Sequence, residues 1–188
     1  MEYTDKQTRI LDSAADHFAR QPFHKVLLSD VARTAAVGKG TLYLYFNSKE
    51  DLYFAVLYRE FDDLLSRLKG VVADESLDPK AQLEALVRGL ARHFLKKAAN
   101  MDMQGVVLTC PSTEDWRLRR AELLSLMESI IRRGVEMGIF HDDNPHLTAK
   151  YIPGLLRGAC HFEPQDTDID AVSRHALCFV LQGLTGEK

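Results

Sequence analysis

VGKGTLYLYFNSKEDL, residues 37–52, predicts a short helix whose two faces differ in chemistry. Gly38 is suited to cap a helix that starts at Lys39 and ends near Phe46. Leu42 lies four residues before Phe46, so these two side chains share one face and can anchor the helix to a core. The other side chains supply an ammonium group, a hydroxyl group and two phenols. An outward-facing helix of this kind suits the major groove of DNA, where hydroxyl groups reach phosphates and base edges and methyl groups touch thymine.

A second short helix precedes this segment. Residues 23–36, FHKVLLSDVARTAA, predict a helix that opens near Ser29 and turns Val31, Ala32 and Ala35 inward. Two short helices separated by a turn of a few residues form a helix-turn-helix. The alternating aromatic residues also fit core packing in any helical bundle, and the pattern alone leaves both interpretations open.

Helical periodicity continues over almost all of the chain, which indicates an all-α fold. Thr4–Gln7 and Ser48–Asp51 are candidate capping boxes at the starts of two of these helices. Apolar residues recur at helical spacing in segments 52–68, 83–98, 123–134, 147–162 and 172–184. The last segment is apolar on more than one face, so it must be buried on several sides.

The segment from Val37 to Leu52 resembles the recognition segment of the tetracycline-repressor (TetR) family, in which G-T-L-Y-x-Y-F-x-S-K-E-x-L follows the turn of a helix-turn-helix. The resemblance is dense over residues 27–52, fair from residue 8, and only architectural beyond about residue 70. It implies that the helix starting near Ser29 braces against the DNA backbone. The resemblance implies DNA contacts, to base edges and phosphates, for Ser29, Lys39, Gly40, Thr41, Tyr43, Tyr45 and Lys49.

The turn departs from the family pattern. Where this chain has Ala36 and Gly38, the family usually has glycine and serine. Hydroxyl residues are common in the family at the positions of Leu27 and Leu28. Because alanine in a left-handed conformation costs about 1–2 kcal/mol, we expect a slightly reshaped turn. The two leucines can remove a phosphate contact, and both departures leave the operator preference open.

The resemblance also implies two domains and a dimer. Residues 1–48 are expected to form a three-helix helix-turn-helix DNA-binding domain, and residues 49–188 a larger helical domain for ligand binding and dimerisation. The last two helices, about 147–162 and 170–185, are expected to build the homodimer interface. Two recognition helices then meet two half-sites of a palindromic double-stranded DNA operator.

A small-molecule effector is expected to release this repressor from its operator. The effector would favour a state in which helix 49–68 is tilted, and a full population shift requires roughly 10⁴-fold selective binding. The candidate pocket residues are Phe61, Leu65, Phe94, Met103, Trp116, Leu123, Met127, Arg157 and His161. Core packing explains the apolar members equally well, and the charged neighbours of Trp116 are also typical of a helix start on the surface.

Net charge does not by itself suggest a nucleic-acid partner. The whole chain carries −3, while residues 1–50 carry a net +1, and the usual footprint of a DNA-binding domain is strongly basic. An all-helical protein whose helix-turn-helix serves a protein partner is therefore the alternative. Salt dependence separates the two, since only binding through phosphates weakens steeply as salt rises.

Other classes of function find little support. The sequence has no G-x-S-x-G, H-E-x-x-H or glycine-rich phosphate loop, so we expect neither an enzyme nor a cofactor. His141, Asp142, Asp143 and His146 cluster before a helix, but their spacing matches no tetrahedral metal site, and we expect no metal. No stretch approaches the roughly 20 apolar residues of a membrane span, and the N-terminus lacks a signal-peptide pattern, so a cytoplasmic protein is expected.

Overall fold

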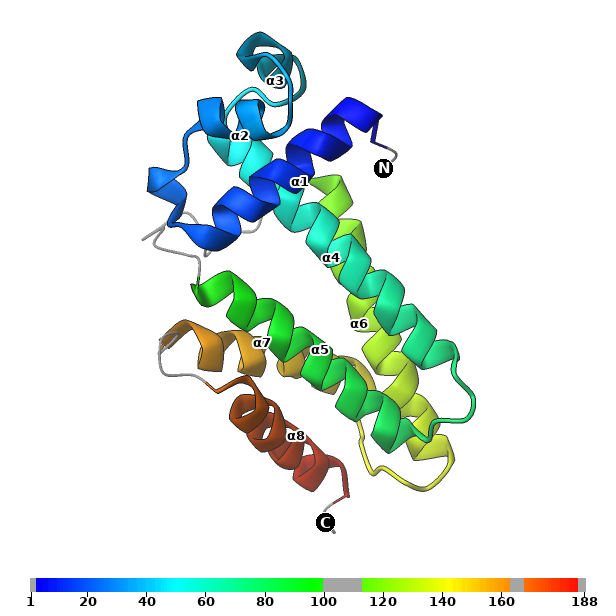
Figure 1. Ribbon diagram of the computed structural model, residues 1–188. Coiled ribbons are helices and arrows are strands. Elements are labelled where there is room, and N and C mark those ends of the chain that lie inside the picture. The colour runs from blue at the N-terminus through cyan, green and yellow to red at the C-terminus, as the bar shows by residue number, and fades with distance from the viewer. Residues whose placement is uncertain (1–2, 100–112, 163–167, 186–188) are drawn as a thin grey trace. The chain divides into compact units, whose positions relative to one another are not determined.

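The computed structural model describes residues 3–99, 113–162 and 168–185. These residues form eight α-helices and one short 3-10 helix without a strand (Figure 1), which confirms the all-α prediction. In chain order the elements are α1 (Asp5–Arg20), η1 (Phe23–Lys25), α2 (Leu28–Thr34), α3 (Lys39–Tyr45), α4 (Lys49–Ala73), α5 (Pro79–Ala99), α6 (Glu114–Glu136), α7 (Pro145–Phe162) and α8 (Ile169–Thr185). Within these residues, no helix is both long and apolar enough to cross a membrane.

The described residues divide into two compact units. The N-terminal unit comprises residues 3–61, and the C-terminal unit comprises residues 62–99, 113–162 and 168–185. The division falls inside α4, after Phe61, so this one helix supplies residues to both units.

In the N-terminal unit, α1 packs against α2 through its apolar face. Ile10 and Leu11 are fully buried, and the buried Ser13 hydroxyl donates a 3.0 Å hydrogen bond to the carbonyl oxygen of Val31 on α2. The start of α1 has the predicted capping box, in which Thr4 and Gln7 each accept a hydrogen bond from the other's backbone N–H. Local capping and tertiary packing therefore fix the same helix.

The turn between α2 and α3 contains a residue in the left-handed conformation. Ala36 has φ +52°, and its N–H donates to the carbonyl oxygen of Arg33 while the N–H of Val37 donates to that of Ala32. These two hydrogen bonds define a Schellman turn, in which glycine is the favoured left-handed residue. Ala36 therefore adopts the left-handed conformation despite its steric cost, and the expected reshaping of the turn stays a prediction.

In the C-terminal unit, α5 contacts α6, α7 and α8 (Figure 1). Its predicted apolar face is buried at Leu83, Leu86, Val87, Leu90 and Ala91. The fully buried Gln82 side chain donates to the carbonyl oxygens of residues 71, 72 and 74, which satisfies acceptors at the end of α4. This amide therefore ties the end of α4 to the start of α5.

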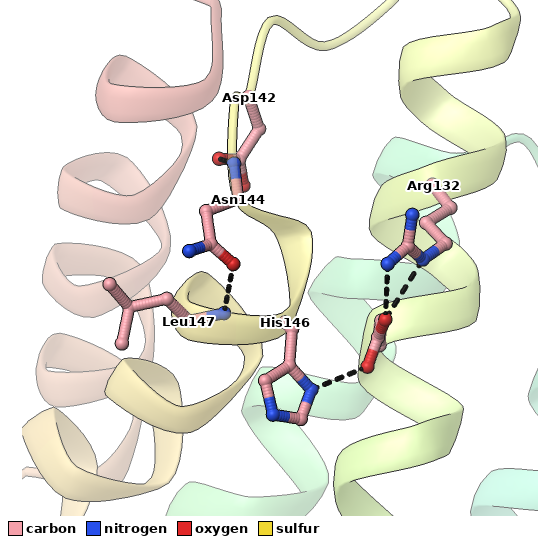
Figure 2. Close-up of polar contacts among 6 residues, drawn as sticks. Arg132, Asp142, Asn144, His146 and Leu147 are labelled. Atoms are coloured by element: carbon pink, nitrogen blue, oxygen red, sulfur yellow. Dashed lines mark hydrogen bonds and ion pairs between the residues drawn. The ribbon is translucent and has the colours of Figure 1, made fainter.

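Side chains at the end of α6 and at the start of α7 stabilise the connection between these two helices. The ring of Phe140 covers Gly134 so closely that a Cβ built on this glycine would stand 2.1 Å from the ring. Asn144 accepts a hydrogen bond from the N–H of Leu147 and so caps α7 (Figure 2). His146 then binds Glu128 of α6, which also accepts from Arg132.

Candidate nucleic-acid interface

Helix α3 is anchored by the two side chains that the sequence indicates. Leu42 is 0% exposed and Phe46 is 5% exposed, so the spacing of four places both in the core of the N-terminal unit, as predicted. The N–H of Phe46 donates to the carbonyl oxygen of Leu42 and closes the last turn of the helix. The rest of α3 is thereby held on a rigid base.

The predicted DNA-contacting residues differ in exposure. Ser29 is exposed on α2, and Lys39 and Gly40 are exposed at the start of α3. Tyr43 is 43% exposed, whereas Thr41 and Tyr45 are half-buried. This surface offers an ammonium group, hydroxyl groups and a phenol to a ligand. The individual DNA contacts stay predictions.

The ammonium group of Lys49 binds backbone carbonyl oxygens of the N-terminal unit. Its Nζ donates to the carbonyl oxygens of Phe23, His24 and Val26 at 3.0, 3.3 and 3.2 Å. An ammonium group has three donors, so these three bonds occupy all of them. The phosphate contact expected of Lys49 stays a prediction, and a phosphate that bound this group would have to displace one carbonyl oxygen.

An aromatic cluster lies beside this ammonium group. The Phe23 ring stacks on Phe18 with centroids 5.7 Å apart, and Tyr53 meets both rings edge-on at 4.9 and 5.2 Å. Burial, and then the negative charge of Glu60, raise the pKa of Tyr53 to about 12. Tyr53 therefore stays a neutral phenol, which allows it to pack between the rings.

The start of α4 is capped by the second predicted box. The Ser48 hydroxyl accepts a 2.9 Å hydrogen bond from the N–H of Asp51. The Asp51 carboxylate accepts from the N–H of Asn47, one residue before the position that the motif predicts. The cap fixes where α4 begins relative to α3 within the N-terminal unit.

Leu44 is a further exposed residue of α3 that the sequence motif does not indicate. This side chain is 83% exposed on α3, and Leu27, before α2, is 57% exposed. Helical spacing could have revealed Leu44, since it lies two residues from the buried Leu42 and four from Gly40. It belongs to the same outward surface as the predicted contacts.

The predicted effector residues fall into several groups. Leu65, Trp116, Leu123 and Met127 are buried in the C-terminal unit, so the alternative surface position for Trp116 is wrong. Phe61 is buried in the N-terminal unit.

Arg157 and Phe94 are brought together. The guanidinium carbon of Arg157 stands 5.5 Å from the centre of the half-buried Phe94 ring. Met103 and the side chain of His161 lie outside the described residues. The pocket itself stays a prediction.

The acidic and histidine cluster before α7 has partners of its own. Asp142 accepts from the N–H of Asn144, and His146 binds Glu128 (Figure 2). Across the part of the chain that the structure describes, no three His, Cys, Asp or Glu side chains are grouped so as to hold a metal ion.

Two family models match this chain. Residues 10–56 match the model described as bacterial regulatory proteins, tetR family, and residues 76–184 match the tetracyclin repressor-like C-terminal domain. The first match contains the helix-turn-helix and the second most of the C-terminal unit.

Individual relatives are regulators of transcription. The chain is 28% identical over 187 residues to the HTH-type transcriptional repressor KstR2 of Rhodococcus jostii, which covers 95% of this chain and 91% of the relative. It is 25% identical over 140 residues to the fatty acid metabolism regulator protein of Bacillus subtilis, and the match covers 71% of this chain and 70% of that protein. A solved structure of FadR from Bacillus subtilis in complex with stearoyl-CoA is similar to this chain, with a TM-score of 0.71 and 20% sequence identity. The match covers 94% of this chain and 98% of that structure's chain.

Proposed function

This chain belongs to the TetR family of bacterial regulatory proteins, and we propose on that premise that it is a homodimeric repressor which a small molecule releases from a palindromic operator. The family and the relatives are DNA-binding transcriptional regulators, not enzymes. Members bind DNA operators and small-molecule effectors and are typically dimers. We assign DNA binding to residues 1–48, and effector binding and dimerisation to residues 49–188.

The observation that carries the proposal is the exposed surface of α3. Leu42 and Phe46 hold the helix in the core, while Lys39 and Tyr43 face solvent. A short helix presented on a rigid base can enter the major groove, with the cation near phosphates and the phenol near base edges.

Dimerisation through α7 and α8 is supported by apolar side chains on these helices that are exposed to solvent in a single chain. Leu147, Tyr151 and Leu155 recur every four residues along α7 and are 39%, 63% and 39% exposed. Phe179 on α8 is 64% exposed, although the sequence pattern predicts burial of this helix on several sides. Because α7 and α8 contact each other, a second copy that packs against both would bury these residues.

For the effector we propose an acyl-coenzyme A thioester. Support comes from the Bacillus subtilis regulators described above, one of which was solved with stearoyl-CoA. In this chain, Leu65, Leu123 and Met127 are apolar residues suited to an acyl chain. The guanidinium group of Arg157 beside Phe94 is a cation suited to a carbonyl or phosphate oxygen.

Helix α4 is the proposed route from effector to DNA. Its first turn carries Lys49, which binds the connection between α1 and α2, and its later residues Asp62 and Lys69 form ion pairs with α6. An effector that favours one position of α4 in the C-terminal unit would shift the population of DNA-binding states.

Selection of bound sequences from random duplex DNA tests the proposal directly. We expect the purified protein to enrich a palindromic site, two chains to bind each site, and stearoyl-CoA to release the DNA while free coenzyme A does not. Enrichment of no sequence at any salt concentration would refute the DNA-binding function, whereas release by another compound would refute only the effector class.

Single substitutions at cationic residues add a matched control. Lys39→Ala should weaken binding to all DNA and make the salt slope shallower by about one unit. Lys80→Ala, at an exposed position of α5, should leave both affinity and slope unchanged.

A further inference from the structure

The outermost face of α3 consists of a glycine and a leucine. An α-helix turns by roughly 100° per residue, so Gly40 and Leu44 share a face, and Leu42 lies nearly opposite to both. The exposures agree with this geometry, since Leu42 is 0% and Leu44 is 83% exposed. Leu44 is more exposed than any other large apolar side chain of the described residues.

No contact among the described residues explains why position 40 is a glycine. A Cβ built on Gly40 would meet no atom within 4 Å beyond its chain neighbours and local helix backbone, and its φ is not positive. Glycine weakens a helix relative to alanine. Within the described residues, neither packing nor backbone conformation therefore requires glycine at this position.

We propose that Leu44 reads the C5-methyl group of a thymine in each operator half-site, and that Gly40 lets the base edges approach the helix closely. The inference rests on the proposed DNA binding. A leucine side chain offers no hydrogen bond, so it gains nothing from phosphate oxygens or from the polar groups of base edges. Among the four bases, only thymine presents a methyl group in the major groove.

The surroundings of Leu44 favour DNA over a second protein chain as the occupant of this face. Lys39 and Tyr43 are exposed on the same short helix and supply a cation and a phenol. A polyanion with apolar methyl groups along its groove complements both kinds of side chain. Leu44 therefore adds sequence discrimination to a surface that Lys39 holds to the phosphates.

The test uses the operator recovered by selection, with each thymine replaced in turn by deoxyuridine, which lacks only the methyl group. In each half-site we expect one thymine to be sensitive. Replacing that thymine alone should lower the affinity of the wild-type protein about fourfold. Leu44→Ala should bind the thymine and uracil sites equally at that position, whereas Leu44→Met should retain the preference. Because the contact is apolar, Leu44→Ala should leave the salt slope unchanged.

Gly40→Ala provides an independent measurement. The variant should fold at least as well as the wild type, as shown by its melting temperature, and yet bind the operator less tightly. Equal sensitivity of wild type and Leu44→Ala at every thymine would overturn the inference while leaving DNA binding intact. If selection enriches no site at all, the proposed function itself fails.

Discussion

The ammonium group of Lys49 lies 4.6 Å from the centre of the Phe23 ring and donates a 3.0 Å hydrogen bond to the carbonyl oxygen of that same residue. Two further bonds reach His24 and Val26. A residue at the first position of α4 thus closes the connection between α1 and α2, and the cation gains from the ring face as well.

Removal of this ammonium group should destabilise the N-terminal unit. Lys49→Met keeps the aliphatic stem but leaves three carbonyl oxygens without their donor, and we expect a loss of about 2 kcal/mol. Urea unfolding followed by circular dichroism measures the loss. Fluorescence of Trp116, the single tryptophan, reports on the C-terminal unit and should change little.

Lys39→Met is the matched control, because Lys39 is exposed. It should leave stability unchanged and weaken DNA binding. A Lys49→Met protein as stable as the wild type, with a shallower salt slope for DNA, would instead assign Lys49 to a phosphate.

Ala36→Gly should stabilise the same unit. Alanine at φ +52° carries a steric cost that glycine avoids, and the greater flexibility of glycine in the unfolded chain offsets part of the gain. We expect a net gain of about 0.5–1 kcal/mol in urea unfolding. A loss of stability would show that the turn relaxes at no cost around Ala36.

These residues show how far the sequence predicts the structure. Periodicity and capping are local, so the burial of Leu42 and Phe46 and the caps at Thr4 and Ser48 could be predicted. The bonds of Lys49 join residues 23 to 26 positions apart, and no local pattern encodes them.

Buried polar and aromatic residues show the same limit. The burial of Gln82 arises from the end of another helix, α4, which needs its amide as a donor. Trp116 has charged neighbours that favoured a surface position, yet the helix turns it inward. A pocket depends on such three-dimensional packing, so periodicity can suggest its members but cannot establish them.

Gly134→Ala should destabilise the C-terminal unit. The new methyl group would overlap the ring of Phe140, which is 1% exposed and has little room to move. Overpacking of this kind costs about 1–3 kcal/mol, and the better helix propensity of alanine recovers about 1 kcal/mol. Trp116 fluorescence should therefore show a lower urea midpoint.

The control for this substitution is Gly70→Ala in α4. A Cβ there meets nothing within 4 Å, so only the gain in helix propensity should remain. Equal effects of the two substitutions would mean that Phe140 moves aside freely.

Acid should weaken the ion pairs between α4 and α6. Hydrogen bonds from Lys69, and then from Arg119, lower the pKa of Glu122 below its ordinary value. A carboxylate with a lowered pKa in the folded state contributes stability above its unfolded pKa and loses it as pH falls through the folded value.

Glu122→Gln should therefore lower the melting temperature at pH 7, and the difference from wild type should shrink below about pH 4.5. The effect is small, because the pair is partly exposed to solvent. Glu75→Gln, an exposed residue between α4 and α5, is the control. A difference that stays constant down to pH 3 would exclude Glu122 as its source.

The exposed apolar face of α7 and α8 gives the sharpest test of assembly. Tyr151→Glu and Phe179→Glu each place a charge where we propose that a second copy packs, and an unpaired buried charge is strongly unfavourable. Sedimentation equilibrium should show the wild type at twice the chain mass of 21.3 kDa and both variants near the single-chain mass. Leu118→Glu, at a 56% exposed apolar position of α6, should stay dimeric.

The two monomeric variants should keep their helical circular dichroism spectrum and lose tight operator binding, because one recognition helix reads only one half-site. Dimers that survive both substitutions would place the interface elsewhere and would leave the exposure of Tyr151 and Phe179 without an explanation in assembly.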